Sequence, residues 1–115
     1  MSTIGDVHVG DVGTRFKGEI QDAGSAFDPS SATSKLLIFK GPGVTTPLER
    51  TATITTTGSG ASQKWYMEYV VLAADITAGL HARKGTWYWQ GYVTFVGGQT
   101  YSTSIETYEV DPNLR

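Results

Sequence analysis

The segment from residue 85 to residue 96, Gly-Thr-Trp-Tyr-Trp-Gln-Gly-Tyr-Val-Thr-Phe-Val, constrains the fold most strongly. A β-strand directs successive side chains to opposite faces, so alternating side chains predict a strand with one buried face. The odd-numbered positions form the expected core face: Trp87, Trp89, Gly91, Val93 and Phe95. The even-numbered positions form the expected outer face: Thr86, Tyr88, Gln90, Tyr92 and Thr94. Because no other segment carries as much apolar mass, we expect it to be the central strand of a β-sandwich.

Other short alternating or β-branched segments are separated by Gly and Pro turns, which is typical of an antiparallel sandwich of about seven strands. The expected strands cover residues 7–9, 14–22, 35–40, 48–57, 64–71 and 101–110. The apolar run Leu36–Phe39 predicts a strand covered on both faces, or covered on one face with the other in an interface. A change of apolar parity between Ile105 and Tyr108 predicts a β-bulge. Residues 72–80 predict one short helical turn that crosses between the sheets.

The bulk properties indicate one domain and exclude several classes of protein. The chain has 115 residues, a net charge of -2 with both signs interspersed, and no cysteine. This balance disfavours nucleic-acid binding, and the absence of cysteine excludes disulfides and thiolate metal sites. No apolar run is long enough for a transmembrane helix, and the N-terminus lacks the pattern of a signal peptide. We expect an extended N-terminal arm over residues 1–12 and a single β-sandwich domain over residues 13–115.

No combination of residues indicates catalysis, a cofactor or a metal. The histidines, His8 and His81, fall in segments read as loops, without a nucleophile motif nearby, and we expect both at the surface. We accordingly expect His81→Ala to be nearly neutral. The loop aspartates have irregular spacing, which turn chemistry explains. We therefore expect no enzyme.

Outward-facing tyrosines are the one suggestive feature of the predicted strands. Tyrosines on a sheet face can pack against neighbouring strands, form a protein interface or stack on a sugar, and all three readings remain open. A basic loop precedes the central strand and adds charge to the candidate surface. The candidate interface residues are Tyr66, Tyr88, Tyr92, His81, Arg83 and Lys84.

Several turn motifs resemble a known family. The motifs are Val-Gly-Asp-Val-Gly-Thr-Arg-Phe at 9–16, Ile-Gln-Asp at 20–22, Asp-Pro-Ser-Ser-Ala-Thr at 28–33, Ala-Ala-Asp-Ile-Thr-Ala-Gly at 73–79, Gly-Thr-Trp at 85–87, and Val110 with Pro112-Asn113. Together they resemble the N-terminal domain family of phage baseplate upper proteins. The chain departs from that pattern in Lys-Gly-Pro-Gly at 40–43 and in an insertion at 80–84.

The resemblance implies an immunoglobulin-like sandwich that serves as a structural protein of the virion. It implies a tail or baseplate component that docks onto other virion proteins by protein–protein contacts, in several copies or as a homo-oligomer. Such a protein is made in the host cytoplasm and located in the virion, without nucleic-acid or membrane partners. The family implies no catalytic residues. The alternative, motivated by the outward tyrosines, is a carbohydrate-binding module for a host surface glycan.

Overall fold

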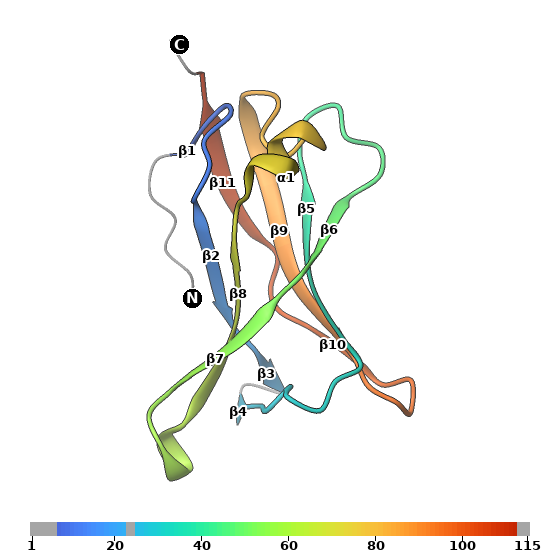
Figure 1. Cartoon of the computed structure of the whole chain (residues 1–115). Helices are drawn as coiled ribbons and strands as arrows, with labels where there is room; N and C mark the ends of the chain where they lie inside the picture. The colour runs from blue at the N-terminus through green and yellow to red at the C-terminus, as the bar shows by residue number, and fades with distance from the viewer. Residues whose placement is uncertain (1–6, 23–24, 113–115) are drawn as a thin grey trace.

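The computed structural model describes residues 7–22 and 25–112 and shows an all-β chain with one short α-helix (Figure 1). The strands are β1 (Val7–His8), β2 (Arg15–Glu19), β3 (Gln21–Asp22), β4 (Ser25–Ala26), β5 (Ser34–Lys40), β6 (Leu48–Thr51), β7 (Thr53–Thr57), β8 (Lys64–Val70), β9 (Gly85–Thr94), β10 (Thr100–Ser102) and β11 (Glu106–Asp111). A 3-10 turn, Gly60–Ser62, joins β7 to β8. The helix α1 (Ala73–Thr77) follows β8, where the sequence predicts a helical turn.

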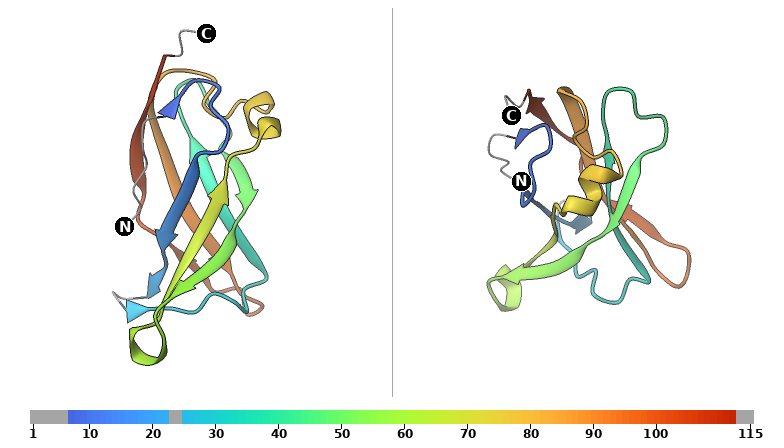
Figure 2. Two further views of the ribbon diagram at one scale, coloured as in Figure 1. Left: turned by 60° about the vertical axis from the view of Figure 1, so that its left-hand side comes forward. Right: turned by 45° about the horizontal axis from the view of Figure 1, so that its top comes forward.

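Two sheets enclose one core. Sheet A has the order β1-β11-β9-β5-β6, with β10 also paired to β9, and sheet B has the order β2-β8-β7. On one side the sheets are joined by a single segment, because β6 pairs with β5, β7 pairs with β8, and only Ala52 separates β6 from β7 (Figures 1 and 2). The segment 48–57, predicted as one strand, therefore divides between the two sheets. The β3–β4 hairpin lies outside both sheets.

The inward faces follow the predicted alternation. Trp87, Trp89 and Val93 of β9 are each at most 2 % exposed. They pack with apolar side chains from both sheets, and the ring of Phe16 lies edge-on to that of Trp89, with centroids 5.8 Å apart. Leu37 of β5 is also buried, which confirms β9 and its neighbour β5 as the centre of the core.

Two glycines make room for the buried indoles. A Cβ at Gly18 would lie 2.6 Å from Cη2 of Trp89, and a Cβ at Gly41 would lie 2.2 Å from the Trp87 ring. These distances are far below van der Waals contact, so the ring of each tryptophan lies directly against backbone. Any larger residue at Gly18 or Gly41 would push an indole out of its place.

The C-terminal segment is divided into β10 and β11. Ser102 lies opposite Tyr92 and Glu106 lies opposite Trp89, so this segment advances by four residues where β9 advances by three. One residue is therefore inserted, as in a bulge, at 103–105 and not between Ile105 and Tyr108. Thr103 holds the insertion in place, because its Oγ1 accepts a hydrogen bond from the Gly91 N–H at 2.8 Å.

The described part of the N-terminal arm pairs within its own chain. Val7 is 1 % exposed and lies opposite Val110, and β1 runs parallel to β11. This is the one parallel pair among the described strands, and it joins the arm to a sandwich that was predicted to be antiparallel. Residues 1–6 of the predicted arm lie outside the described residues.

His81 is a core residue, so its expected surface position is wrong. Its side chain is fully buried, with Nε2 2.6 Å from the Tyr108 hydroxyl and the ring edge-on to Trp87. Burial lowers the pKa of His81 to about 4, against the opposing effect of Asp11 and Asp75. The backbone at this residue has φ at 54°, in the left-handed region that residues other than glycine rarely adopt. His81→Ala is accordingly not expected to be neutral.

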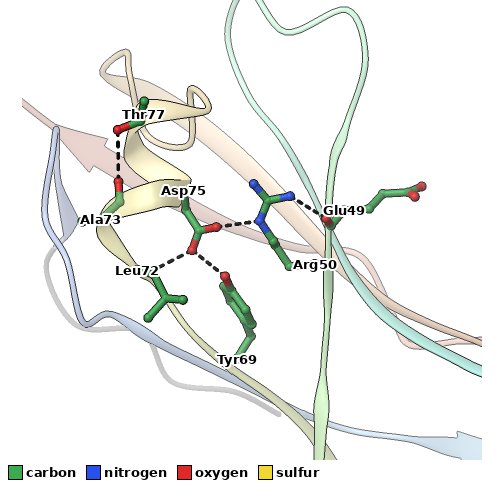
Figure 3. A network of polar contacts seen from close by, with 7 residues as sticks. All are labelled: Glu49, Arg50, Tyr69, Leu72, Ala73, Asp75 and Thr77. Atoms are coloured by element: carbon green, nitrogen blue, oxygen red, sulfur yellow. Dashed lines mark hydrogen bonds and ion pairs between the residues drawn. The ribbon is translucent and has the colours of Figure 1, made fainter.

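A buried carboxylate ties α1 to both sheets (Figure 3). Asp75, only 2 % exposed, accepts hydrogen bonds from Arg50 Nε at 2.6 Å, from the Tyr69 hydroxyl at 2.5 Å and from the Leu72 N–H at 2.8 Å. Burial alone would raise the pKa of Asp75, but these hydrogen bonds outweigh it and hold the pKa below its ordinary value. Arg50 belongs to β6 in sheet A and Tyr69 to β8 in sheet B. The hydrogen bonds of Asp75 therefore connect the two sheets to each other and to α1.

Replacing Trp87 by alanine should lower the free energy of unfolding by about 3–5 kcal/mol, because it empties the site of a buried aromatic ring. Urea denaturation followed by circular dichroism measures this loss. Tyr88→Ala on the outer face of the same strand is the control and should cost less than about 1 kcal/mol. Equal losses in the two variants would contradict the assignment of faces.

Stability should fall on acidification through His81. The pKa of His81 in the folded chain, about 4, lies below its ordinary value of 6.5. The unfolded chain therefore binds a proton more readily across this range, so the stabilising contribution of neutral His81 is complete above pH 6.5 and is lost as the pH falls towards 4.

Urea denaturation at several pH values tests this, with His81→Gln as the non-titrating variant. The wild type should lose up to about 1.4 kcal/mol more per pH unit than His81→Gln within this range. Parallel slopes for wild type and His81→Gln would show that His81 is accessible to protons in the folded chain.

Asp75→Ala should cost about 2–3 kcal/mol, because it leaves Arg50, Tyr69 and a backbone N–H without their acceptor. Asp75→Asn should also destabilise, since an amide supplies one acceptor oxygen where the carboxylate supplies two. Glu49→Ala is the matched control, because the Glu49 carboxylate points away from the network (Figure 3). A loss for Asp75→Ala no larger than that for Glu49→Ala would rule out a stabilising network.

Candidate binding surfaces

The outer face of sheet A carries an apolar row of side chains. Along the β5–β9 ladder, Leu36 lies opposite Tyr92 and Lys40 lies opposite Tyr88. These side chains point away from the core, because their sequence neighbours Leu37 and Phe39 are fully buried. The apolar run 36–39 is therefore buried on one face and half-exposed on the other, so the predicted arrangement with both faces covered is wrong.

A shallow groove of about 270 Å³ lies on this face and is named here the Tyr88 groove. Tyr88 is 45 % exposed and Ile105 is 62 % exposed, which are high values for large apolar side chains. Among the lining residues, Lys40 carries the only charge, and Gln90 and the Tyr88 hydroxyl add neutral polar groups. The lining residues are Ile38, Lys40, Pro47, Tyr88, Trp89, Gln90 and Ile105. Contiguous exposed apolar surface of this kind marks sites of association.

The predicted candidate tyrosines do not form one surface. Tyr88 and Tyr92 belong to β9 in sheet A, but Tyr66 belongs to β8 in sheet B. The Tyr66 ring is covered in part by Lys17, whose Nζ lies 4.7 Å from the ring centroid. Tyr66 therefore packs within its own sheet, as one of the predicted alternatives has it, while Tyr88 contributes to an exposed groove.

The basic loop before β9 is only partly as expected. Arg83 and Lys84 are exposed, whereas His81 is buried and cannot form part of a surface in this conformation. The Arg83 carbonyl accepts a hydrogen bond from Trp87 Nε1 at 2.9 Å, so the loop also holds a core indole in place. Of the candidate interface residues, only Tyr88 lines the Tyr88 groove.

Sequence reasoning did not single out Ile38 or Ile105 as surface residues. One of the two arrangements predicted for the run 36–39 left one face of the strand for an interface. The alternation of side chains within this strand cannot show which residues of other strands lie beside that face. Ile105 was predicted to lie in the last strand, 101–110, just before a β-bulge. The insertion at 103–105 turns it outward, next to Tyr88, and that placement depends on the pairing of β10 and β11 with β9.

A second concave site, named here the lateral cleft, opens on the side of the molecule opposite the β6–β7 segment. Its volume is about 220 Å³, and its lining comes from β2, β3, β9, the 103–105 insertion and β11. Here β2 is the edge strand of sheet B. The lining residues are Gly18, Glu19, Gln21, Trp89, Thr103, Ser104 and Glu106.

The part of the chain that the structure describes shows no metal site and no membrane-spanning helix. No three His, Cys, Asp or Glu side chains among residues 7–22 and 25–112 come together as ligands. No helix within these ranges is long and apolar enough to cross a bilayer. Besides the Tyr88 groove and the lateral cleft, the described residues line a third concave site of about 230 Å³, formed by Phe27, Phe95, Gln99 and Tyr101.

Comparison of the chain with protein-family models, with curated proteins and with solved structures gives no match. Inferences about function therefore rest on these surfaces and on the sequence motifs.

Proposed function

We propose that this chain is a structural protein of a phage virion, a tail or baseplate component that docks onto other virion subunits through the Tyr88 groove. The exposed apolar groove on the outer face of sheet A carries the proposal. The resemblance of the turn motifs to the N-terminal domain family of phage baseplate upper proteins supplies the biological setting. The same resemblance supports an immunoglobulin-like arrangement of the all-β fold, and assembly in several copies.

The chemistry of the groove suits a protein partner. Ile38, Pro47 and Ile105 offer apolar surface whose removal from water is favourable by about 25 cal/mol per Å². Tyr88 adds an aromatic ring with a polar hydroxyl, a residue type enriched at interfaces. Lys40, the one charged residue of the lining, favours a partner that presents an apolar side chain next to a carboxylate.

The scaffold beneath the groove is rigid enough for docking. Tyr88 and Gln90 belong to β9, which pairs with the full length of β5, from Ser34↔Thr94 to Lys40↔Tyr88. The buried Trp87 and Trp89 alternate with them and anchor the same strand in the core. A groove built on a central strand keeps its shape on binding, which lowers the entropic cost of association.

Ile105→Lys and Tyr88→Lys should abolish incorporation into particles, because each places an ammonium group in the interface. Tagged variants would be supplied in trans during growth of a phage that encodes this chain, and incorporation measured by immunoblot of gradient-purified particles. We expect a loss of at least about 10-fold for each variant, as for central interface residues. Thr57→Lys, an exposed site on sheet B, is the matched control and should incorporate normally.

Two results would count against the proposal, and they differ in meaning. Wild-type chain in the infected-cell lysate but missing from purified particles would exclude a virion protein. Normal incorporation of both groove variants would retain the virion assignment but exclude the Tyr88 groove as the docking site. Thermal unfolding of each purified variant, monitored by circular dichroism, shows that the substitutions leave the fold intact.

A further inference from the structure

The strand β7 lies at an edge of sheet B, and its backbone hydrogen bonds to β8 can be assigned residue by residue. In an antiparallel ladder, the backbone groups of successive residues point to opposite sides of the strand. On β8, Trp65 bonds to the β2 side, because its carbonyl accepts a hydrogen bond from the Ile20 N–H at 3.0 Å. Tyr66 therefore bonds to the opposite side, where its register partner on β7 is Thr55. Thr55 thus directs its N–H and C=O groups towards β8.

The neighbours of Thr55 on β7, Ile54 and Thr56, direct their N–H and C=O groups away from β8. The Ala52 N–H gives the same parity independently, because it donates to the Lys35 carbonyl on β5 at 2.9 Å. Even-numbered residues of the β6–β7 segment therefore face the side on which β5 lies. Beyond Ala52, none of the described strands pairs with that side of the segment. The backbone groups of Ile54 and Thr56 consequently form a free sheet edge.

This edge of β7 lacks the devices that protect strand edges, which are charged side chains, proline and very short length. β7 has five residues, and the whole run 51–63 contains neither a charge nor a proline. By the same alternation, the outward residues of β2 are Arg15, Lys17 and Glu19, and β6 has Glu49 on its free side. β1 and β10 have only two and three residues. Among the strands that the structure describes, β7 alone presents a free edge of five uncharged residues.

The edge of β7 is also accessible. The β7–β8 hairpin, which turns at Gly60–Ser62, projects beyond the other strands at one end of the molecule in every view (Figures 1 and 2). Thr56 and Thr57 are exposed. An incoming strand can therefore approach the outer half of β7 from solvent.

From these observations we infer that β7 pairs with β7 of a second copy of this chain, antiparallel and about a two-fold axis at Thr55. This axis places Ile54 of each copy opposite Thr56 of the other, so the outward residues of both copies exchange their N–H···O bonds. The uncharged edge brings no like charges together, and cross-strand pairs of threonine are favourable. The edge is therefore complementary to itself, and sheet B becomes continuous across two copies.

The inference deepens the proposed function, on which it rests only for the expectation that several copies assemble. It uses a different surface, because β7 belongs to sheet B and the Tyr88 groove lies on the outer face of sheet A. Pairing through one five-residue strand is a small contact compared with the roughly 1,200–2,000 Å² of stable interfaces. We therefore expect a reversible dimer that forms at high protein concentration.

Sedimentation velocity of the purified chain, at concentrations up to about 1 mM, measures this dimer. Thr56→Pro removes an outward N–H but none of the hydrogen bonds to β8, and should weaken dimerisation by at least about 10-fold. Lys17→Pro makes the same change at an outward position of β2 and is the matched control. Lys17→Pro, Tyr88→Lys and Thr57→Lys should dimerise as the wild type does. Thermal unfolding followed by circular dichroism checks that each variant is folded.

Single cysteines test the register of the pairing, because the chain itself contains none. Thr55 faces its own copy in a pair without hydrogen bonds, where side chains lie closest, so Thr55→Cys should form a disulfide-linked dimer under mild oxidation. Thr53→Cys, which faces Thr57, and Lys17→Cys should remain largely uncrosslinked.

Three results would overturn the inference. A monomer at every concentration would leave the edge of β7 to a strand of another protein. Wild-type dimerisation of Thr56→Pro, or crosslinking of Lys17→Cys without Thr55→Cys, would place the contact elsewhere. Loss of the dimer in Tyr88→Lys alone would assign self-association to the Tyr88 groove and leave the proposed docking surface standing.

Discussion

The contact between the indoles of β9 and the backbone of facing segments is the interaction on which the rest of this structure depends. Trp87 lies against Gly41 and Trp89 lies against Gly18, so each large ring occupies the space that a side chain would fill. Because apolar burial is the main source of stability, these rings set how closely β9 approaches β2 and the β5–β6 loop. The outer surface of β9 and the lateral cleft both follow from that arrangement.

The two sides of the molecule are closed by different means. On one side, β6 and β7 form a single segment shared by both sheets, and the Asp75 network joins this segment to β8 and α1 (Figure 3). On the other side, β2 is an edge strand and the β10–β11 segment is interrupted. A polar cleft can exist on that second side because no strand crosses between the sheets there.

The Tyr88 groove and the lateral cleft differ in the chemistry of the side chains that line them. The Tyr88 groove is apolar with one cation, Lys40, and suits a protein surface. The lateral cleft is lined by two carboxylates, Glu19 and Glu106, and by no basic side chain. Both depend on β9, since Tyr88 and Trp89 are neighbours in sequence whose side chains project to opposite faces.

The sequence by itself determined the strands, because alternation along β9 and the apolar run of β5 follow directly from the geometry of a strand. It also predicted the short helical turn, and it predicted a bulge in the last strand but placed it between Ile105 and Tyr108 instead of at 103–105. Only the tertiary structure decided that His81 is buried, that segment 48–57 serves two sheets, and that Ile105 lies beside Tyr88. The lateral cleft could not be predicted from the sequence either, because Glu19, Trp89 and Glu106 come from three different strands. Burial and proximity depend on which distant segments pack together, and periodicity within one segment carries no information about its partners.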